Sequence, residues 1–553
     1  MIIQLVEGWL FDAYLLREKI VFWIKQDNGD TVRLEDSRWS HSIYVASDDK
    51  SNLKSIVNRI MDSDAACLVK DYEFTSRYET IIDKTKSEVL KLTLSDSAKA
   101  SALARRIETI NGNNIFGRVR LYNVDLLPEQ SYFYGHDIFP LAFCEVHDNN
   151  HLQLSWDNKD DVWASDYKIP GFKIIHLDLN LKKKGKKIPK YTDKIDTISI
   201  TQQEGKGHEC FEIQSPSEDN MIEQLAIEIK RIDPDFIFTN DGDSFTFPCL
   251  IYRAETNGMS NNLILGREPA ISLKRSAKEG TSYFSYGRTY FKPSAIKLFG
   301  RIHIDTDNSF ILNDAGLEGL YEISRICRMP LHTAARASIG KCLSSLQFYY
   351  ATRKEILVPW KPILAEYFKT FEELLVADRG GFIFEPETET HEQVAEFDFV
   401  SLYPNIMLKK NLSAETIHCN CCPDSKLRVP ELNHNICERR VGIVPTSLKI
   451  LLEKRAIYKH LKKSTTNQKL KAVYDARQTS LKWILVTSFG YLGFNNAKFG
   501  RIDAHIAVCA FDRQIVLQVA KIAERHGFKV LHGIVDSLWI KKNSNTAKSI
   551  EKR

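Results

Sequence analysis

The chain has 553 residues, which is long enough for three or more domains that each bury a core of their own. With 43% hydrophobic and 27% charged residues, the composition excludes a disordered chain and a membrane-embedded one. The net charge of +5 is mild for this length, so a nucleic-acid site has to come from local clustering of cations. No apolar run approaches the ~20 residues of a membrane span, and residues 1–7 lack the charged start of a signal peptide. We therefore expect a cytoplasmic protein with no membrane partner.

The first 165 residues predict a β-rich domain. Short β-prone runs, such as residues 19–24 and 42–46, are separated by turn residues such as Asn28 and Gly29. Apolar residues recur at helical spacing over residues 97–110, which predicts one amphipathic helix there. This part of the chain contains no catalytic constellation.

A new pattern starts at residue 171. Residues 172–180 read as a buried strand that carries Asp178, and residues 195–200 read as the next strand. A run of lysines begins at Lys182 between them, and a solvated turn is the favoured interpretation of that run. Residues 320–390 predict helices with an apolar face, followed by a glycine turn at residues 378–382.

The most informative stretch is VAEFDFVSLYPNIMLKKN, residues 394–411. Its apolar, β-prone residues predict a buried strand that carries Asp398, and the run from Ser401 to Pro404 turns the chain into a helix. An unpaired carboxylate in a buried strand would cost several kcal/mol, a cost that a bound metal would remove. An acid at a strand end beside an aromatic residue suits a two-metal phosphoryl-transfer site. A helix-capping acid is the alternative for an isolated Asp.

Four of the eleven cysteines fall within twenty residues, beside His418 and His434. These four can supply the soft ligands of a structural zinc, although their spacing is not that of a standard zinc ribbon: Cys419, Cys421, Cys422 and Cys437. A disulfide between Cys437 and one of the others, or free buried thiols, are the alternatives. The other seven cysteines are expected to be reduced core residues.

Two basic helices follow. The first starts near Val444 and carries Arg455 and Lys459 at i,i+4, so that both side chains point the same way. After a polar break at residues 464–467, the second helix carries Lys482 and Phe489 on one face, seven residues apart. Two antiparallel helices that face each other with cations form a clamp suited to a triphosphate. Solvated basic faces are the alternative for the charges taken alone.

Residues 398–416 resemble the first palm motif of family B DNA polymerases, D-x-x-S-L-Y-P-x-I with its continuation to Thr416. The degenerate motifs look most like the short, motif-divergent archaeal branch of that family. The resemblance implies an α/β multidomain fold with an N-terminal β-rich domain, an RNase-H-like exonuclease-type domain, and the palm and fingers of a right-hand polymerase whose thumb is short or missing. The domains expected are an N-terminal domain (1–165), a degenerate exonuclease-like domain (166–320), connecting helices and palm entry (321–390), palm (391–445), fingers (446–500) and a second palm segment lacking the thumb (501–553).

The resemblance also implies roles for individual residues. Residues 528–539 read as a β-hairpin with its turn near residues 533–535; they match the third palm motif Y-x-D-T-D-S, with His532, Ile534 and Val535 replacing three of its residues and Asp536 retaining the second acid. Asp398 and Asp536 would then hold two Mg²⁺ ions. Residues 482–490 match the fingers motif K-x-x-x-N-S-x-Y-G, with Lys482 retained. The nucleotide-binding residues implied are Leu402, Tyr403, which would exclude a ribose 2′-hydroxyl, Arg455, Lys459, Lys482 and Phe489.

The exonuclease motifs are more degenerate. Asp178 is retained from the family's D-x-E motif, but Asn180 takes the place of the glutamate. Thr246 stands where the second motif has an aspartate, and residues 310–314 are a weak counterpart of the third, with Phe310 in place of tyrosine. We expect the 3′–5′ exonuclease to be absent or very weak, unless nearby acids substitute: Asp241, Asp243 or Asp305.

The resulting hypothesis is a DNA-directed DNA polymerase of low processivity, without proofreading. Its implied partners are primer–template DNA, deoxynucleotides, and a sliding clamp or other replication and repair factors. The alternative is a non-catalytic DNA-binding or accessory protein on a decayed polymerase fold.

Overall fold

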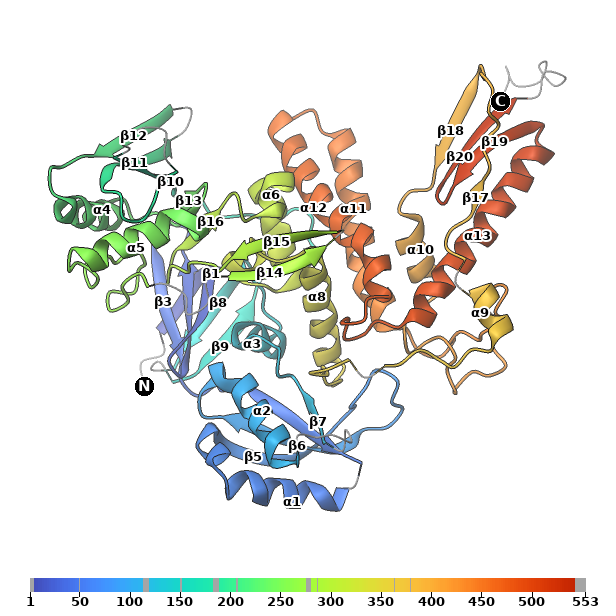
Figure 1. The fold of residues 1–553 in the computed structure, drawn as a ribbon, viewed down its shortest axis with the longest axis horizontal. Helices are drawn as coiled ribbons and strands as arrows, with labels where there is room; N and C mark the ends of the chain where they lie inside the picture. The colour runs from blue at the N-terminus through green and yellow to red at the C-terminus, as the bar shows by residue number, and fades with distance from the viewer. Residues whose placement is uncertain are drawn as a thin grey trace.

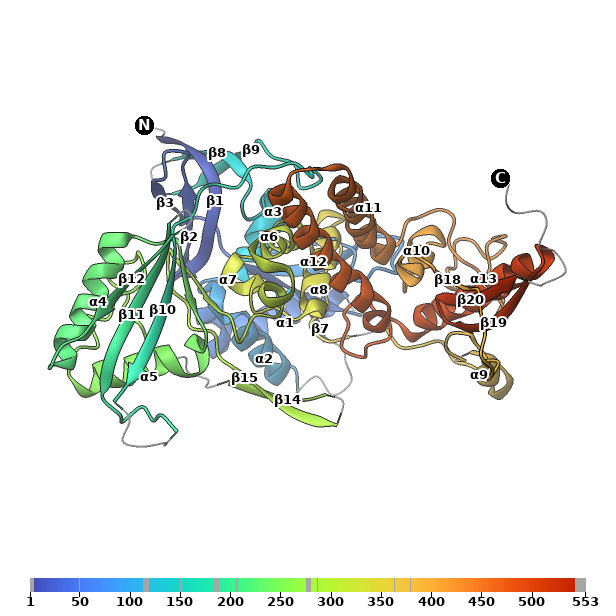
Figure 2. The same cartoon turned by 90° about the horizontal axis from the view of Figure 1, so that it is seen from above.

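The computed structural model describes residues 4–48, 50–112, 119–149, 152–182, 188–204, 207–274, 280–285, 287–362, 364–377 and 379–542. Figure 1 shows an elongated molecule with one β-sheet domain at each end and a helical centre between them. Seen from above, the same two ends lie on opposite sides of the central helices (Figure 2). No helix among the described residues is long and apolar enough to cross a membrane.

The N-terminal part is β-rich, as predicted, and contains two antiparallel sheets. The first has the order β3-β2-β1-β8-β9, built from β1 (Gln4–Leu16), β2 (Lys19–Lys25), β3 (Thr31–Asp36), β8 (Phe143–Asp148) and β9 (Leu154–Asn158). The second has the order β5-β6-β4-β7 and is covered by two helices: β4 (Ser42–Ser47), β5 (Val69–Arg77), β6 (Ser87–Leu94), β7 (Val119–Tyr122), α1 (Lys50–Met61) and α2 (Ala100–Ile110). The strands predicted at residues 19–24 and 42–46 and the helix predicted at 97–110 are confirmed. Helix α3 (Pro128–His136) packs against β1.

The exonuclease-like region is a mixed five-stranded sheet in the order β12-β11-β10-β13-β16. Its strands are β10 (Ile174–Leu181), β11 (Ile195–Glu204), β12 (Gly207–Ile213), β13 (Phe236–Thr239) and β16 (Ile302–Asp305). Helices α4 (Glu218–Ile232) and α5 (Phe247–Thr256) pack on it, and β14 (Gly280–Ser285) and β15 (Arg288–Pro293) form a separate hairpin. The predicted buried strand at residues 172–180 is wrong in its burial, because β10 alternates and exposes His176, Asp178 and Asn180. Of the lysine run, only Lys182 lies within the described residues.

The centre of the molecule is helical up to Arg353. It comprises α6 (Phe310–Cys327), which is kinked at Gly316, α7 (Leu331–Ala334) and α8 (Ile339–Arg353). The prediction of helices throughout residues 320–390 is wrong beyond that point, because the described part of residues 354–370 is mostly irregular and only α9 (Phe371–Ala377) follows. Of the predicted glycine turn, residue 378 lies outside the described residues.

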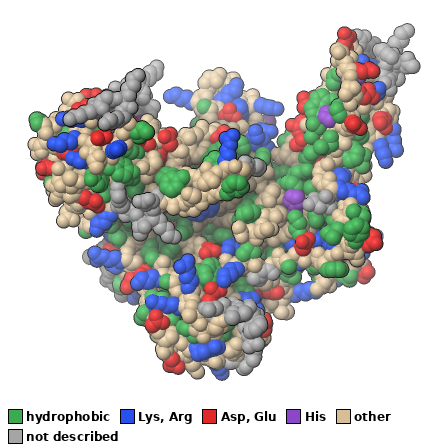
Figure 3. Space-filling view, in the orientation of Figure 1, with side chains coloured by type: hydrophobic (Ala, Val, Ile, Leu, Met, Phe, Trp, Pro, Cys, Tyr) green, Lys and Arg blue, Asp and Glu red, His purple; other side chains and the backbone are tan. Residues whose placement is uncertain are grey.

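The second end of the molecule is a four-stranded antiparallel sheet in the order β17-β19-β20-β18. Its elements are β17 (Ile383–Phe384), β18 (Val394–Asp398), β19 (Phe528–Ile534), β20 (Ser537–Lys542) and the helices α10 (Leu402–Lys409) and α13 (Ile502–Arg525). The predicted burial of β18 is wrong, since every residue of this edge strand is exposed. The reason is that α13 packs along β19 and β20 and does not reach the edge, which leaves Phe397 57% exposed. In Figure 3 hydrophobic side chains gather on this arm, at the right of the view.

The two predicted basic helices are α11 (Ile443–Ser464) and α12 (Gln468–Leu492). They pack against each other, and α12 packs against α6. A buried ion pair joins Lys454 of α11 to Glu322 of α6 at 2.9 Å, and Arg477 of α12 pairs with Glu318 of α6 at 2.8 Å. The helix pair is therefore attached by its charged side chains to the same helix that follows the exonuclease-like sheet.

Candidate active site

Two carboxylates meet at one end of the β17-β19-β20-β18 sheet, which is called the palm sheet below. Asp398 is the last residue of β18, and its cross-strand partner on β20 is Ser537, the residue after Asp536. The backbone N–H of Phe399 donates a hydrogen bond of 2.9 Å to the carbonyl oxygen of Asp536, which fixes the two strand ends beside each other. Both acids are exposed, and neither side chain has a hydrogen bond or ion pair to a described residue.

Asp398 is exposed, whereas the sequence predicted a buried carboxylate. An exposed carboxylate carries no large desolvation cost, so burial is not the reason to place a metal there. The hairpin that carries Asp536 turns at Val535 and Asp536, slightly later than predicted, with Val535 at a φ of 51°. The left-handed conformation of a β-branched residue is strained, and it places the Asp536 side chain at the tip of the turn.

A third acid, Asp512, lies behind this pair and was not predicted from the sequence. It belongs to α13, its exposed fraction is 0%, and neither of its carboxylate oxygens has a hydrogen-bond partner among the described residues. Burial, and next the charge of Asp536, raise the pKa of Asp512 to about 7, while the nearby backbone N–H of Phe382 opposes this shift. The available signal was a single acid inside the apolar helical run of residues 506–516.

Cations from both fingers helices gather near these acids. Arg455 donates a hydrogen bond of 2.7 Å to the hydroxyl oxygen of Ser401, which lies three residues after Asp398. Burial first, and then the charges of Arg455, Lys463 and Lys482, lower the pKa of Lys459, while Asp398 opposes this shift. The predicted trio of Arg455, Lys459 and Lys482 is thus brought together, and Lys463 joins it.

An aromatic layer separates the fingers from the palm. The Tyr403 and Phe489 ring centroids lie 4.3 Å apart, and Phe489 stacks on His505 at 4.1 Å. Burial raises the pKa of Tyr403, and the charge of Asp512 adds to that shift. Leu402 is buried in the core rather than open to a ligand.

The predicted exonuclease residues do not form a comparable group. Asp178 and Asn180 are exposed on β10, whereas Thr246 is buried and donates a hydrogen bond to the carboxylate of Asp241. At the third motif, the indole N–H of Trp483, from the fingers, donates to Asp314, and the Trp483 ring packs edge-on against Phe310 at 5.1 Å.

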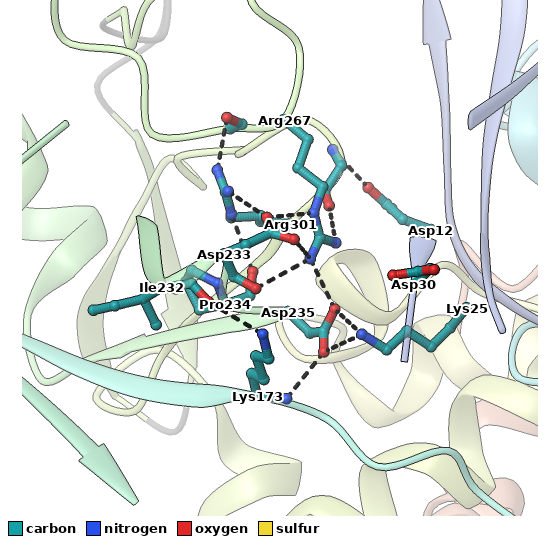
Figure 4. Close-up of polar contacts among 12 residues, drawn as sticks. Asp12, Lys25, Asp30, Lys173, Ile232, Asp233, Pro234, Asp235, Arg267 and Arg301 are labelled. Atoms are coloured by element: carbon teal, nitrogen blue, oxygen red, sulfur yellow. Dashed lines mark hydrogen bonds and ion pairs between the residues drawn. The ribbon is translucent and has the colours of Figure 1, made fainter. Parts of the chain in front are cut away.

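The other acids of this domain are held by internal partners. Asp243 receives two hydrogen bonds from Arg336, at 2.6 and 3.0 Å, and Asp305 accepts the backbone N–H of Asp243 at 2.8 Å. Burial raises the pKa of Asp305 to about 6. Figure 4 shows a second network, in which Asp235 pairs with Lys25 and Arg267. Each of these carboxylates is bound by other groups of the protein.

The four clustered cysteines come together in space. Their Sγ atoms all lie within 4.8 Å of one another. The Sγ of Cys421 lies 3.4 Å from that of Cys437 and 3.8 Å from that of Cys422, and the Sγ atoms of Cys422 and Cys437 are 3.9 Å apart. All four are free thiols, and the side chain of Asn435 holds the loop by donating to the carbonyl oxygens of Cys419 and Cys422. A tetrahedral zinc with Zn–S bonds of about 2.3 Å needs S···S separations of about 3.8 Å, so the donor set fits. Two of the other seven cysteines, Cys67 and Cys210, are exposed, contrary to expectation.

A palm sheet with acids at its strand ends, opposite a cationic helix pair and joined to an exonuclease-type domain, defines a polynucleotide polymerase architecture. The models of DNA polymerase family B and of the family B exonuclease domain match residues 342–551 and 119–310. The chain therefore belongs to family B of the DNA polymerases.

Similar proteins come from archaea. DNA polymerase 2 of Saccharolobus solfataricus is 37% identical over 235 residues, covering 42% of this chain and 34% of that protein. The DNA polymerase of Archaeoglobus fulgidus is 25% identical over 610 residues, covering 99% of this chain and 72% of that protein. The family B DNA polymerase of Pyrobaculum calidifontis has the same fold, with a TM-score of 0.72 at 21% identity over 98% of this chain and 75% of that one. The chain thus spans about a third of the length of the first relative and under three quarters of the second.

Proposed function

We propose that this chain carries out template-directed DNA synthesis, adding deoxynucleotides to the 3′-hydroxyl of a primer. The observation that carries the proposal is the meeting of Asp398 and Asp536, two unpartnered carboxylates at adjoining strand ends, within reach of the cations of the fingers. The substrates are primer–template DNA and deoxynucleoside triphosphates.

Asp398 and Asp536 are the residues that would hold Mg²⁺, because hard divalent cations prefer carboxylate oxygens. Bound Mg²⁺ ions would neutralise phosphate charge and favour ionisation of the primer hydroxyl. Arg455, Lys459 and Lys482 bind the triphosphate from the fingers side. Burial, and next the repulsion among these cations, lower the pKa of Lys459, and an anionic ligand would relieve that repulsion.

Tyr403 serves as the steric barrier against a ribose 2′-hydroxyl. Its ring is held from behind by Phe489, which in turn stacks on His505, so the barrier is positioned by packing on the fingers helix. Phe489 then lies where it can pack near the nascent base pair.

The exonuclease-like domain acts as a scaffold without proofreading in this proposal. Two-metal hydrolysis needs several carboxylates around the ions. Asp243, Asp305 and Asp314 are engaged by Arg336, by backbone amides or by Trp483, so none of these three is free to hold an ion together with Asp178. Digestion of a labelled mismatched primer tests this: degradation at the rate of extension, lost in Asp178→Ala, would contradict it.

The cysteine cluster is proposed as a structural zinc site. Purified protein should contain about one zinc per chain, and Cys437→Ser should lose it and lower the melting temperature, whereas Cys67→Ser should change neither. Zinc-free protein whose melting temperature does not respond to added zinc would rule the site out.

Primer extension decides between the polymerase and an accessory DNA-binding protein. Wild type should extend a primer on a template in Mg²⁺ or Mn²⁺, Asp398→Asn should not, and Asp178→Asn should match wild type. Equal inactivity of wild type and Asp398→Asn over a range of both metals, with DNA binding retained, would favour the accessory role.

A further inference from the structure

Asp512 is the buried acid that the proposed mechanism leaves unused. It lies on α13, the helix that packs along β19 and against α10. Its exposed fraction is 0% and both of its carboxylate oxygens lack hydrogen-bond partners among the described residues. A buried carboxylate without a partner is strongly disfavoured, so its position needs a reason.

The Asp512 carboxylate lies close to the turn that carries Asp536. Its Oδ2 atom lies 3.2 Å from the point that a Cβ at Gly381 would occupy, and the hydroxyl oxygen of Tyr403 lies 3.1 Å from the same point. The Cγ2 atom of Val535, the residue beside Asp536, lies 2.8 Å from it. Asp512 thus converges with Tyr403 and the Asp536 turn on one small space, which the absence of a side chain at Gly381 leaves open.

The neighbouring cations are occupied elsewhere. Arg513 follows Asp512 in sequence, but its guanidinium bonds both carboxylate oxygens of Glu431, at 3.1 and 2.5 Å, and the carbonyl oxygen of Gly380 at 2.6 Å. The ammonium of Lys410 lies over the Phe511 ring, 5.3 Å from its centroid. No ion pair therefore neutralises Asp512 within the described part of the chain.

The adjoining strand, β19, ends beside this turn with an apolar residue and no carboxylate. Ile534, two residues before Asp536, ends β19 with an apolar side chain that is 41% exposed, beside the turn where anionic ligands would gather around a cation. Carboxylate oxygens are the protein ligands that hard divalent cations prefer, and a further carboxylate at a two-acid site would strengthen their binding. Asp512 approaches the same turn from the helix side.

We propose that Asp512 is a third carboxylate of the palm metal site, which shares a divalent cation with Asp536. This inference deepens the proposed function, because it assigns a further residue to the same site. It gives a role to a fully buried acid that no ion pair neutralises.

The test measures Mn²⁺ binding to the full chain without turnover, by electron paramagnetic resonance, and compares Asp512→Asn with wild type. Mn²⁺ affinity should fall about tenfold or more in Asp512→Asn. The melting temperature without metal should stay the same or rise, because the costly buried charge has gone. Glu524→Gln, an exposed acid on the same helix, is the matched control and should bind Mn²⁺ like wild type.

A rescue variant separates a ligand role from a packing role. In the double variant Asp512→Asn/Ile534→Asp, a carboxylate returns on the other side of the turn and should restore at least part of the Mn²⁺ affinity. Unchanged Mn²⁺ affinity in folded Asp512→Asn would overturn the inference while leaving DNA synthesis untouched. Conversely, Mn²⁺ binding that depends on Asp512 in a wild-type protein that extends no primer would sustain the metal site and defeat the proposed function.

Discussion

The exonuclease-like sheet and the palm sheet both place acids at strand ends, but they treat those acids in opposite ways. In the exonuclease-like domain, Asp243 is bound by Arg336, Asp235 by Lys25 and Arg267, and Asp305 by backbone amides. In the palm, no ion pair joins Asp398, Asp512 or Asp536 to a cation of the described residues. In this protein, a metal site is therefore expected where several acids without internal partners lie together, as in the palm, and not where a single exposed acid such as Asp178 stands alone.

The largest effect is expected from Asp536→Asn. Loss of a carboxylate that positions metal should lower primer extension about a thousandfold or more, measured under single-turnover conditions. The melting temperature should stay within error of wild type, because the side chain is exposed and unpaired. Extension within tenfold of wild type would show that Asp536 does not position a catalytic metal.

The opposite pattern, a loss of stability, is expected for Arg336→Met in the exonuclease-like domain. Removing this guanidinium leaves the buried Asp243 carboxylate without a neutralising charge, although Ile296 and Asn308 still donate hydrogen bonds to it, and should lower the free energy of unfolding by about 3–5 kcal/mol. Asp178→Asn, on the exposed face of the same domain, should change it by no more than about 0.5 kcal/mol. Denaturant unfolding of the two variants measures both values, and similar stabilities would show that the buried pair is not what holds this domain.

A smaller effect concerns sugar selection. Tyr403→Ala should raise the use of ribonucleotides relative to deoxynucleotides by about two orders of magnitude, because it removes the ring beneath the sugar. Tyr403→Phe keeps the ring and is the matched control. A ratio unchanged in Tyr403→Ala would place the nucleotide elsewhere.

The smallest effect is expected from Lys482→Ala. Loss of one charge-assisted contact to the triphosphate should raise the KM for the nucleotide by about tenfold. Lys469→Ala, at the far end of the same helix, should leave KM unchanged. If both variants have the KM of wild type, the cations of α12 form only a solvated face and do not bind the triphosphate.

Local sequence signals predicted the elements that carry the site. The hairpin bearing Asp536, the strand end at Asp398 and the two basic helices follow from periodicity, turn residues and motif spacing. Burial was less predictable: the apolar residues of β18 are typical of a core strand, yet their strand lies at the sheet edge beyond the reach of α13.

Partners distant in sequence could not be predicted at all. Asp243 and Arg336 are 93 residues apart, and only the folded chain shows that this acid is unavailable to a metal. Asp512 was missed for the same reason, because nothing in a helical run indicates that one of its residues faces a turn that follows 23 positions later.

The most direct test of the contrast between free and committed acids is an anomalous difference map from crystals of the protein with primer–template DNA and Mn²⁺. Manganese peaks are expected against Asp398 and Asp536, and none against Asp243 or Asp305, whose carboxylates have internal partners. A manganese ion against Asp243 or Asp305, or an empty palm beside bound DNA, would contradict this expectation.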